Sequence, residues 1–167
     1  VDWNNENAMV EIIRNSQIRL EYTNKGPRIF VADSDVTESL RDDEVELKVS
    51  LVSKVLEIRD LMVLNQRQIA KSGPIVMVGR DIGSVVLPNA SKKIYLDASA
   101  KTRALRRFKD TNNKTVDDVI RNIMARDKID SERSHAPLRI PNGAYKIDTD
   151  DMTIDQVVTE ITKYISK

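Results

Sequence analysis

The fold of this chain is decided by the stretch Ile75-Val76-Met77-Val78-Gly79-Arg80-Asp81-Ile82-Gly83. Its first four residues are apolar and follow Gly73-Pro74, which predicts a strand buried on both faces of a parallel sheet. Two glycines then bracket Arg80 and Asp81, and glycine allows both a sharp turn and a close approach of the backbone to a ligand. Ligands of open α/β sheets bind beyond the carboxyl ends of the strands, so this pair is expected beside a small anionic ligand.

Arg80 and Asp81 are suited to different groups of one ligand. The planar guanidinium of Arg80 can give a phosphate two parallel, charge-assisted hydrogen bonds. The carboxylate of Asp81 can accept a hydrogen bond from an amino or hydroxyl group of the same molecule. Taken alone, the pair is equally compatible with a structural ion pair at the end of a strand.

Composition restricts the class of protein. The 167 residues are 40% hydrophobic and 32% charged, as in a globular protein of one domain, or of a core with a small appendage. There is no cysteine, which excludes disulfides and thiolate metal sites. No apolar run approaches the roughly 20 residues that cross a bilayer. We therefore expect a cytoplasmic protein without a membrane partner.

Charge is distributed unevenly, although the net charge is only +1. Residues 1–60 contain 8 Lys/Arg and 13 Asp/Glu, whereas residues 101–139 contain 11 Lys/Arg and 6 Asp/Glu. A basic segment inside an almost neutral chain indicates a compact anion as ligand, because proteins that bind long polyanions usually have a strongly basic domain. A nucleic-acid partner is therefore not expected.

The remaining sequence predicts strands that alternate with helices from residue 57 onward, which implies a parallel sheet. Before that point, alternation over residues 18–22 and 28–31 around a turn at 24–27 predicts a hairpin, and residues 33–36 are expected to form a loop. Asn4-Asn5, Thr115 and Thr153 are expected to cap helices. Beyond the helix that follows Asn5, the expected helices span about 42–55, 57–71, 100–112, 115–129 and 153–165, and the expected strands span 75–78, 93–97 and 144–148.

Two short helices joined by an Asn-rich break carry an unusual number of arginines. Arg103 and Arg107 are four residues apart and therefore share a helix face. After the break, Arg126, Asp130 and Arg133 follow at spacings of four and three, and they share a face if that helix continues far enough. Such helices can form a flap that closes over a phosphoryl group and excludes water. The alternative is a set of exposed arginines that serve solubility.

Three motifs, in order and at suitable spacing, closely resemble bacterial cytidylate kinase. They are Gly79-Arg80-Asp81-Ile82-Gly83-Ser84-Val85-Val86-Leu87-Pro88, Lys93-Ile94-Tyr95-Leu96-Asp97-Ala98-Ser99 and Ala125-Arg126-Asp127-Lys128-Ile129-Asp130-Ser131-Glu132-Arg133. Ile147-Asp148-Thr149, followed by a helix that opens at Thr153, fits the same family. The hairpin at 18–31 resembles the family's insert in its nucleoside-monophosphate domain, so the resemblance covers essentially the whole chain. One departure is Ile129, where relatives often have a charged residue.

The resemblance implies which side chains contact CMP. They form three groups, which read the cytosine, hold the α-phosphate, and contact the ribose and phosphate. The cytosine would be read by Ser50, Arg59 and Asp81, and the α-phosphate would be held by Arg80. The ribose and phosphate would be contacted by Arg126, Asp130 and Arg133. The family's lid would contain Arg103, Arg106 and Arg107. The expected catalytic side chains are Arg103, Arg107, Arg126 and Arg133.

The implied fold is the α/β, parallel-sheet fold of the P-loop nucleoside-monophosphate kinases, N-terminally incomplete. We expect an NMP-binding region with the hairpin insert at 1–56, core sheet at 57–100, a helical lid at 101–139, and a core strand with the C-terminal helix at 140–167. The family's phosphate-binding loop, Gly-x-x-x-x-Gly-Lys-[Ser/Thr], is not in this sequence, where none of the 5 glycines precedes a lysine. We therefore expect an N-terminal segment that was removed, was not ordered or was lost from the gene. We also expect the chain alone to be inactive, because nothing in it cradles the phosphates of ATP.

The implied activity is transfer of the γ-phosphate of ATP to CMP or dCMP, with Mg²⁺ bound to the ATP. The resemblance further implies a monomer, and no metal site formed by protein side chains is expected. The alternative from another class is a noncatalytic pyrimidine-nucleotide-binding module. His135, the single histidine, invites interpretation as a general base. Phosphoryl transfer depends mainly on positioning and charge, however, so a structural or exposed His135 is expected.

Overall fold

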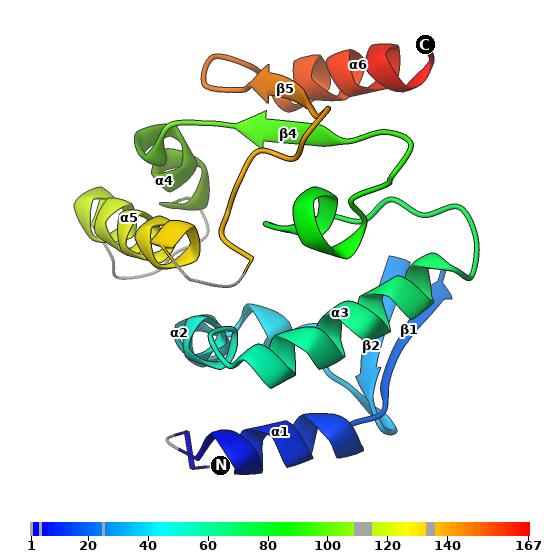
Figure 1. The fold of residues 1–167 in the computed structure, drawn as a ribbon. Helices are drawn as coiled ribbons and strands as arrows, with labels where there is room; N and C mark the ends of the chain where they lie inside the picture. Colours follow the sequence, from blue (N-terminus) through cyan, green and yellow to red (C-terminus); the bar gives the residue numbers. More distant parts are fainter. Residues whose placement is uncertain (1, 4, 25, 109–114, 133–135) are drawn as a thin grey trace. The chain divides into compact units, whose positions relative to one another are not determined.

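The computed structural model describes residues 2–3, 5–24, 26–108, 115–132 and 136–167, and the chain forms two compact units, residues 1–72 and 73–167 (Figure 1). The division into four functional regions at 1–56, 57–100, 101–139 and 140–167 stays a prediction. None of the helices in the described ranges has the length and apolar character that a membrane-spanning helix needs.

The first unit contains an antiparallel sheet preceded by a helix. α1 (Glu6–Asn15) begins where the side chain of Asn5 accepts a hydrogen bond from the backbone N–H of Ala8 at 3.0 Å, which confirms the predicted cap. β1 (Ile18–Thr23) and β2 (Gly26–Val31) form the predicted hairpin, with Ile18 opposite Val31. The loop predicted at 33–36 is wrong in part, because β3 (Ser34–Asp35) adds a short third strand. Ala32, with a φ of 52°, reverses the chain tightly enough for this pairing.

Three further helices complete the first unit. They are the 3₁₀ turn η1 (Ser39–Arg41), α2 (Asp43–Val52) and α3 (Leu56–Ala70). α2 ends three residues before the predicted position, because Val55 has extended backbone and serves as the N-cap residue of α3. A core of buried side chains forms between α1 and α3, and its members are Met9, Val10, Val55 and Ile58. This core gives the first unit a hydrophobic interior of its own.

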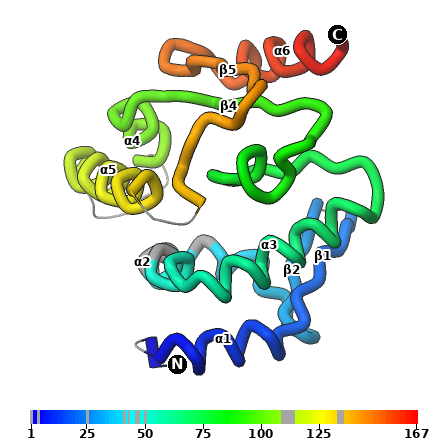
Figure 2. Tube along the Cα trace, in the orientation of Figure 1, coloured from blue at the N-terminus to red at the C-terminus, as the bar shows by residue number. Residues whose placement is uncertain are grey.

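The second unit is organised by a parallel pair of strands. β4 (Ile94–Asp97) pairs with β5 (Tyr145–Asp148) over their whole length, which confirms both predicted strands and their parallel arrangement. α6 (Ile154–Ile165) begins at the predicted capping box of Thr153 and Gln156 and lies beside β5 (Figure 2). The Tyr145 ring stacks on that of Tyr164 with 4.5 Å between centroids. The helix therefore packs beside β5 through this ring pair.

A helical pair, α4 (Ala100–Phe108) and α5 (Val116–Glu132), lies between the two strands in the sequence. It packs through a buried core of Ala104, Val119 and Ile123. At the start of α5, the Asp118 backbone N–H donates to the Thr115 hydroxyl at 3.2 Å, and the Thr115 backbone N–H donates to the Asp118 carboxylate at 3.1 Å. This reciprocal cap confirms the predicted start, and the helix continues three residues beyond the predicted end.

The strand predicted at 75–78 is wrong. This segment forms neither helix nor strand, and Val76 and Val78 are 89% and 91% exposed. A strand exists only where a neighbouring strand takes up its backbone hydrogen bonds, and within the described residues the sheet of the second unit has the order β4-β5. Apolar composition predicts burial, but it cannot supply the pairing partner.

Candidate functional site

The candidate site lies in the second unit, at the carboxyl ends of β4 and β5. Ser99 follows β4 closely, and its backbone N–H donates to the carboxylate of Asp150 at 2.7 Å. Thr149 follows β5 directly, and both its backbone N–H and its hydroxyl donate to the carbonyl of Asp97 at 2.9 Å. These hydrogen bonds hold two loops together at the edge of the strand pair where ligands of parallel sheets bind.

The turn that carries Arg80 leads into the same site. Arg80 and Asp81 precede η2 (Ile82–Val86), a single π-helical turn in which the Ile82 carbonyl accepts from the backbone N–H of Leu87 at 2.7 Å. At Gly83 the backbone approaches Pro141 closely, because a Cβ atom on Gly83 would lie 2.9 Å from that proline ring. The turn is therefore held against the segment that precedes β5.

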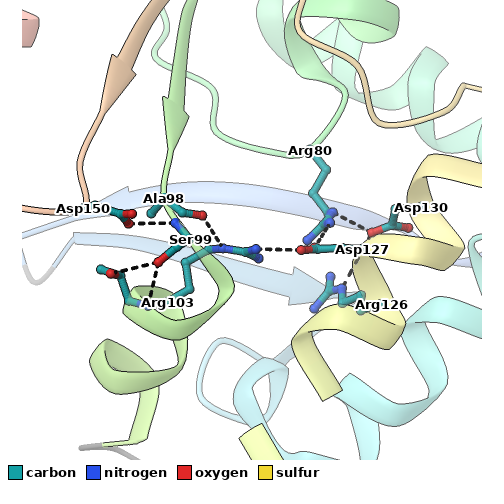
Figure 3. Close-up of polar contacts among 9 residues, drawn as sticks. Arg80, Ala98, Ser99, Arg103, Arg126, Asp127, Asp130 and Asp150 are labelled. Atoms are coloured by element: carbon teal, nitrogen blue, oxygen red, sulfur yellow. Dashed lines mark hydrogen bonds and ion pairs between the residues drawn. The ribbon is translucent and has the colours of Figure 1, made fainter. Parts of the chain in front are cut away.

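Arg80 is bound by two carboxylates of α5 (Figure 3). Its Nη2 donates to Oδ1 of Asp127 at 2.5 Å, and its Nε lies 2.5 Å from Oδ2 of Asp130. The second contact is an ion pair without the alignment of a hydrogen bond. Asp130 is only 4% exposed, and a carboxylate so deeply buried is tolerated only beside a cation. Arg80 supplies that cation.

Two more arginines join from the helical pair. Arg103 of α4 donates from Nη2 to Oδ2 of Asp127 at 2.7 Å and from Nε to the carbonyl of Ala98 at 3.0 Å. Arg126 of α5 lies with its Nε 3.9 Å from Oδ2 of Asp130. Figure 3 shows these side chains converging from α4, α5 and the turn before η2. We call this set the arginine cluster; its members are Arg80, Arg103, Arg126, Asp127 and Asp130.

The arginine cluster holds three cations and two carboxylates, so it is one positive charge in excess when all five groups are ionised. Burial raises the pKa of Asp127, but hydrogen bonds from Arg103 and Arg80 outweigh that effect and keep its pKa below the ordinary value of an aspartate. Asp127 is therefore ionised at neutral pH, and the excess positive charge is available for an anion.

The structure brings together Arg80, Arg103, Arg126 and Asp130 of the residues predicted from the sequence. Asp81 is half-buried at the start of η2, and Arg107 is half-buried on α4, one turn beyond Arg103. Arg59 lies on α3 of the first unit, where its Nη1 donates to the carbonyl of Ser53 at 3.4 Å.

The structure does not describe the side chains of two predicted site residues, Arg133 and Ser50, or that of the single histidine, His135. Arg133 and His135 lie outside the described residues. Ser50 lies on α2, and its side chain is not among those described.

Two features of the site are missed by sequence reasoning. Asp127 is part of a quoted motif, yet no role is predicted for it, although it lies three residues before Asp130 and hence on nearly the same face of α5. Arg106 is expected in the lid, but its guanidinium donates to the hydroxyl of Thr149 at 3.0 Å and to the Thr149 carbonyl. Arg106 thus fastens α4 to the loop after β5, a contact for which the sequence offers no local signal.

An α/β unit with a net positive arginine cluster at the carboxyl edge of its parallel strands has the features of a protein that binds a phosphorylated ligand. Comparison with known proteins identifies the family. The family model described as cytidylate kinase matches residues 1–167. The chain belongs to the cytidylate kinase family, whose fold is that of a P-loop nucleoside-monophosphate kinase. The expected family and fold class are thereby confirmed.

Curated relatives agree with this assignment. The cytidylate kinase of Caldanaerobacter subterraneus subsp. tengcongensis is 41% identical over 171 residues, which cover 100% of this chain and 75% of the relative. The cytidylate kinases of Bacillus licheniformis and Bacillus subtilis are 41% and 40% identical, and in each case the match covers 100% of this chain and 76% of the relative.

Proposed function

We propose that this sequence, as part of a chain that also supplies a phosphate-binding loop, transfers the γ-phosphate of ATP to CMP and dCMP. The observation that carries the proposal is the arginine cluster at the carboxyl edge of β4 and β5, in a chain that belongs to the cytidylate kinase family. The curated relatives are themselves named cytidylate kinase. A noncatalytic pyrimidine-nucleotide-binding module is not favoured, because no relative cited above has a name of that kind.

The proposed chemistry needs positioning and charge more than a reactive side chain. A phosphoryl group in transfer carries negative charge on its peripheral oxygens, and fixed guanidinium groups stabilise that charge in a site that excludes water. We assign Arg80, Arg126 and Arg133 to the phosphate of CMP, and Arg103, which shares the Asp127 carboxylate with Arg80, to the same phosphate. The phosphoryl group in transfer is assigned to the expected catalytic side chains, which are Arg103, Arg107, Arg126 and Arg133. Each arginine presents several N–H donors in one plane, which matches the oxygens of a phosphate.

The proposed recognition of the nucleoside uses the polar side chains that the family resemblance assigns to cytosine and ribose. Asp81 would accept a hydrogen bond from the exocyclic amino group of cytosine, which uracil lacks. Ser50 and Arg59 are assigned to the same base, and Asp130 to the ribose. Hydrogen-bonding sites of this kind discriminate strongly, because the wrong base leaves a buried polar group without its partner.

Mg²⁺ is proposed to accompany ATP. Within the described ranges there is no group of three histidine, cysteine, aspartate or glutamate side chains that could hold a metal ion. This does not conflict with the proposal, since Mg²⁺ in such enzymes is bound largely by phosphate oxygens and water. We therefore expect a chelator to abolish turnover while leaving the affinity for CMP, measured by calorimetry, unchanged. We further propose that the protein acts as a monomer in the cytoplasm, where its nucleotide substrates would be found.

The experiment that tests the function is a coupled assay of ADP release on the full-length protein, with ATP as donor and CMP, dCMP, UMP or AMP as acceptor. We expect turnover with CMP and dCMP, and kcat/KM at least tenfold lower with UMP and AMP. Binding of CMP without any release of ADP, under conditions where a related cytidylate kinase turns over, would instead support the noncatalytic module.

A further inference from the structure

We propose that Asp127 is a positioning residue, which presents Arg80 and Arg103 together to the phosphate of the bound nucleotide. This inference rests on the proposed function, because it assumes that the two arginines hold phosphate. The observation behind it is that the two oxygens of one carboxylate are divided between them. Oδ1 accepts from Arg80 and Oδ2 accepts from Arg103, at 2.5 and 2.7 Å (Figure 3).

The three residues come from separate elements. Asp127 lies in the middle of α5, Arg103 lies on α4, and Arg80 lies in the turn before η2. Arg103 is 24 residues and Arg80 is 47 residues from Asp127 in the sequence. The carboxylate therefore joins parts of the chain that are distant in sequence. Asp127 thus holds both guanidinium groups next to each other.

Both arginines are held at two of their nitrogens. Arg103 is fixed at Nη2 by Asp127 and at Nε by the carbonyl of Ala98. Arg80 is fixed at Nη2 by Asp127 and lies with Nε against Asp130. A guanidinium has five N–H donors, so these contacts orient each group and still leave donors for phosphate oxygens.

Charge gives Asp127 a second role in positioning. Without its carboxylate, the arginine cluster would contain three cations and one anion, and mutual repulsion would drive the guanidinium groups apart. With it, the excess is a single positive charge, which still attracts phosphate. The conformational entropy of two long side chains is also lost before the substrate arrives, and so does not weaken binding. Asp127 should therefore act on phosphate affinity without touching the substrate.

The test compares Asp127→Asn with a control, Asp117→Asn, on the full-length protein. Asp117 is an exposed carboxylate in the first turn of α5, about 15 Å away from Asp127 along the helix. Dissociation constants of CMP and of cytidine are measured by calorimetry, together with KM and kcat for CMP. Because cytidine lacks the phosphate, we expect Asp127→Asn to weaken CMP roughly 10- to 100-fold and to leave cytidine binding within about twofold. Asp117→Asn should bind CMP and cytidine with the affinities of the parent protein.

A double variant separates positioning from general support of the fold. If Asp127 acts through Arg103, the substitution Asp127→Asn should cost clearly less CMP affinity in an Arg103→Ala background than in the parent. If Asp127→Asn does not fold, Asp127→Glu replaces it. That variant keeps the charge, but its longer side chain cannot hold both arginines in the same geometry, so CMP should again weaken more than cytidine.

Three results would overturn the proposal. They are unchanged CMP affinity in Asp127→Asn, tighter CMP binding, and equal losses for CMP and cytidine. Tighter binding would mean that the carboxylate competes with phosphate, and equal losses would mean that it only maintains the fold. Failure of the proposed function looks different, because the parent protein would then release no ADP with CMP whatever the behaviour of Asp127→Asn.

Discussion

Arg126 and Arg121 show how different the surroundings of two arginines on one helix can be. Both lie on α5, five residues apart. The Arg126 side chain is 37% exposed and lies beside the buried Asp130, whereas the Arg121 side chain is 70% exposed and donates to Asp118 at the helix surface. At the scale of the residue, the contribution of a charged side chain depends on its burial and on its ion-pair partner more than on its residue type.

The contrast between these two arginines predicts different costs for their removal. Arg126→Ala should raise KM for CMP or lower kcat by roughly 10- to 100-fold, because a charge-assisted hydrogen bond contributes about 1.5–3 kcal/mol. Arg121→Ala should change either constant by no more than about twofold, as expected of an exposed ion pair. Assays at two salt concentrations check this, because a partly buried contact is screened less than an exposed one. Equal kinetics for the two variants would show that Arg126 is a solvated surface residue.

Asp81 carries a prediction about the base. Asp81→Asn preserves size but replaces an acceptor-only carboxylate with an amide that also donates, so discrimination between CMP and UMP should relax. The measurement is the ratio of the dissociation constants for CMP and UMP. The Asp117→Asn variant serves as the control, since it removes a charge without touching the turn before η2. An unchanged ratio in Asp81→Asn would remove this residue from base recognition.

At the scale of the element, the helix starts are local and the strands are not. The caps of α1, α5 and α6 each involve side chains within three residues of the bonded N–H, so they can be identified in the sequence. The segment 75–78 has the composition of a buried strand and is exposed, because pairing depends on a distant partner. The hydrogen bonds of a helix cap can be predicted from neighbouring residues, whereas the hydrogen bonds between paired strands depend on residues far away in the sequence.

The capping box of α6 predicts opposite effects for two similar substitutions. Thr153→Ala removes the hydroxyl that accepts from the Gln156 N–H, so the free energy of unfolding should fall by about 1 kcal/mol. Thr159→Ala, inside the same helix and exposed, should be neutral or stabilising by a few tenths of a kcal/mol, since alanine favours helix more than threonine does. Urea unfolding followed by circular dichroism measures both. A loss in Thr159→Ala as large as in Thr153→Ala would mean that the capping hydrogen bond contributes nothing specific.

At the scale of the whole molecule, each unit has its own buried core. Ile58 of the first unit is 3% exposed, and Val119 of the second unit is also 3% exposed. Ion pairs occur in both units, for example between Arg28 and Asp35 of the first, but the arginine cluster with its buried Asp130 belongs entirely to the second unit. Apolar packing therefore supports both units, while the charge network supports the unit that holds the candidate site.

The charge network predicts a loss of stability in acid. The pKa of Asp127 is lower in the folded protein than the roughly 3.9 of an unfolded aspartate, so its stabilising effect is complete above that pH. The effect is lost as the pH falls through the folded pKa, because a protonated carboxyl no longer pairs with Arg80 and Arg103. Urea midpoints measured between pH 7 and pH 3 should fall less steeply in Asp127→Asn than in the parent or in Asp117→Asn. Identical slopes would show that the pairing of Asp127 does not stabilise the fold.

The sequence by itself determined the helix caps, the hairpin and the parallel strands β4 and β5. The caps and the hairpin depend on neighbours within a few residues, and the parallel pair follows from the alternation of apolar strands with helices along the chain. Only the tertiary structure decided that 75–78 stays unpaired, that Arg106 fastens α4 to the loop after β5, and that Asp127 joins Arg80 to Arg103. The physical reason is distance along the chain, because contacts across 24 to 47 residues depend on how helices and turns pack, and side chains that meet in this way share no local pattern.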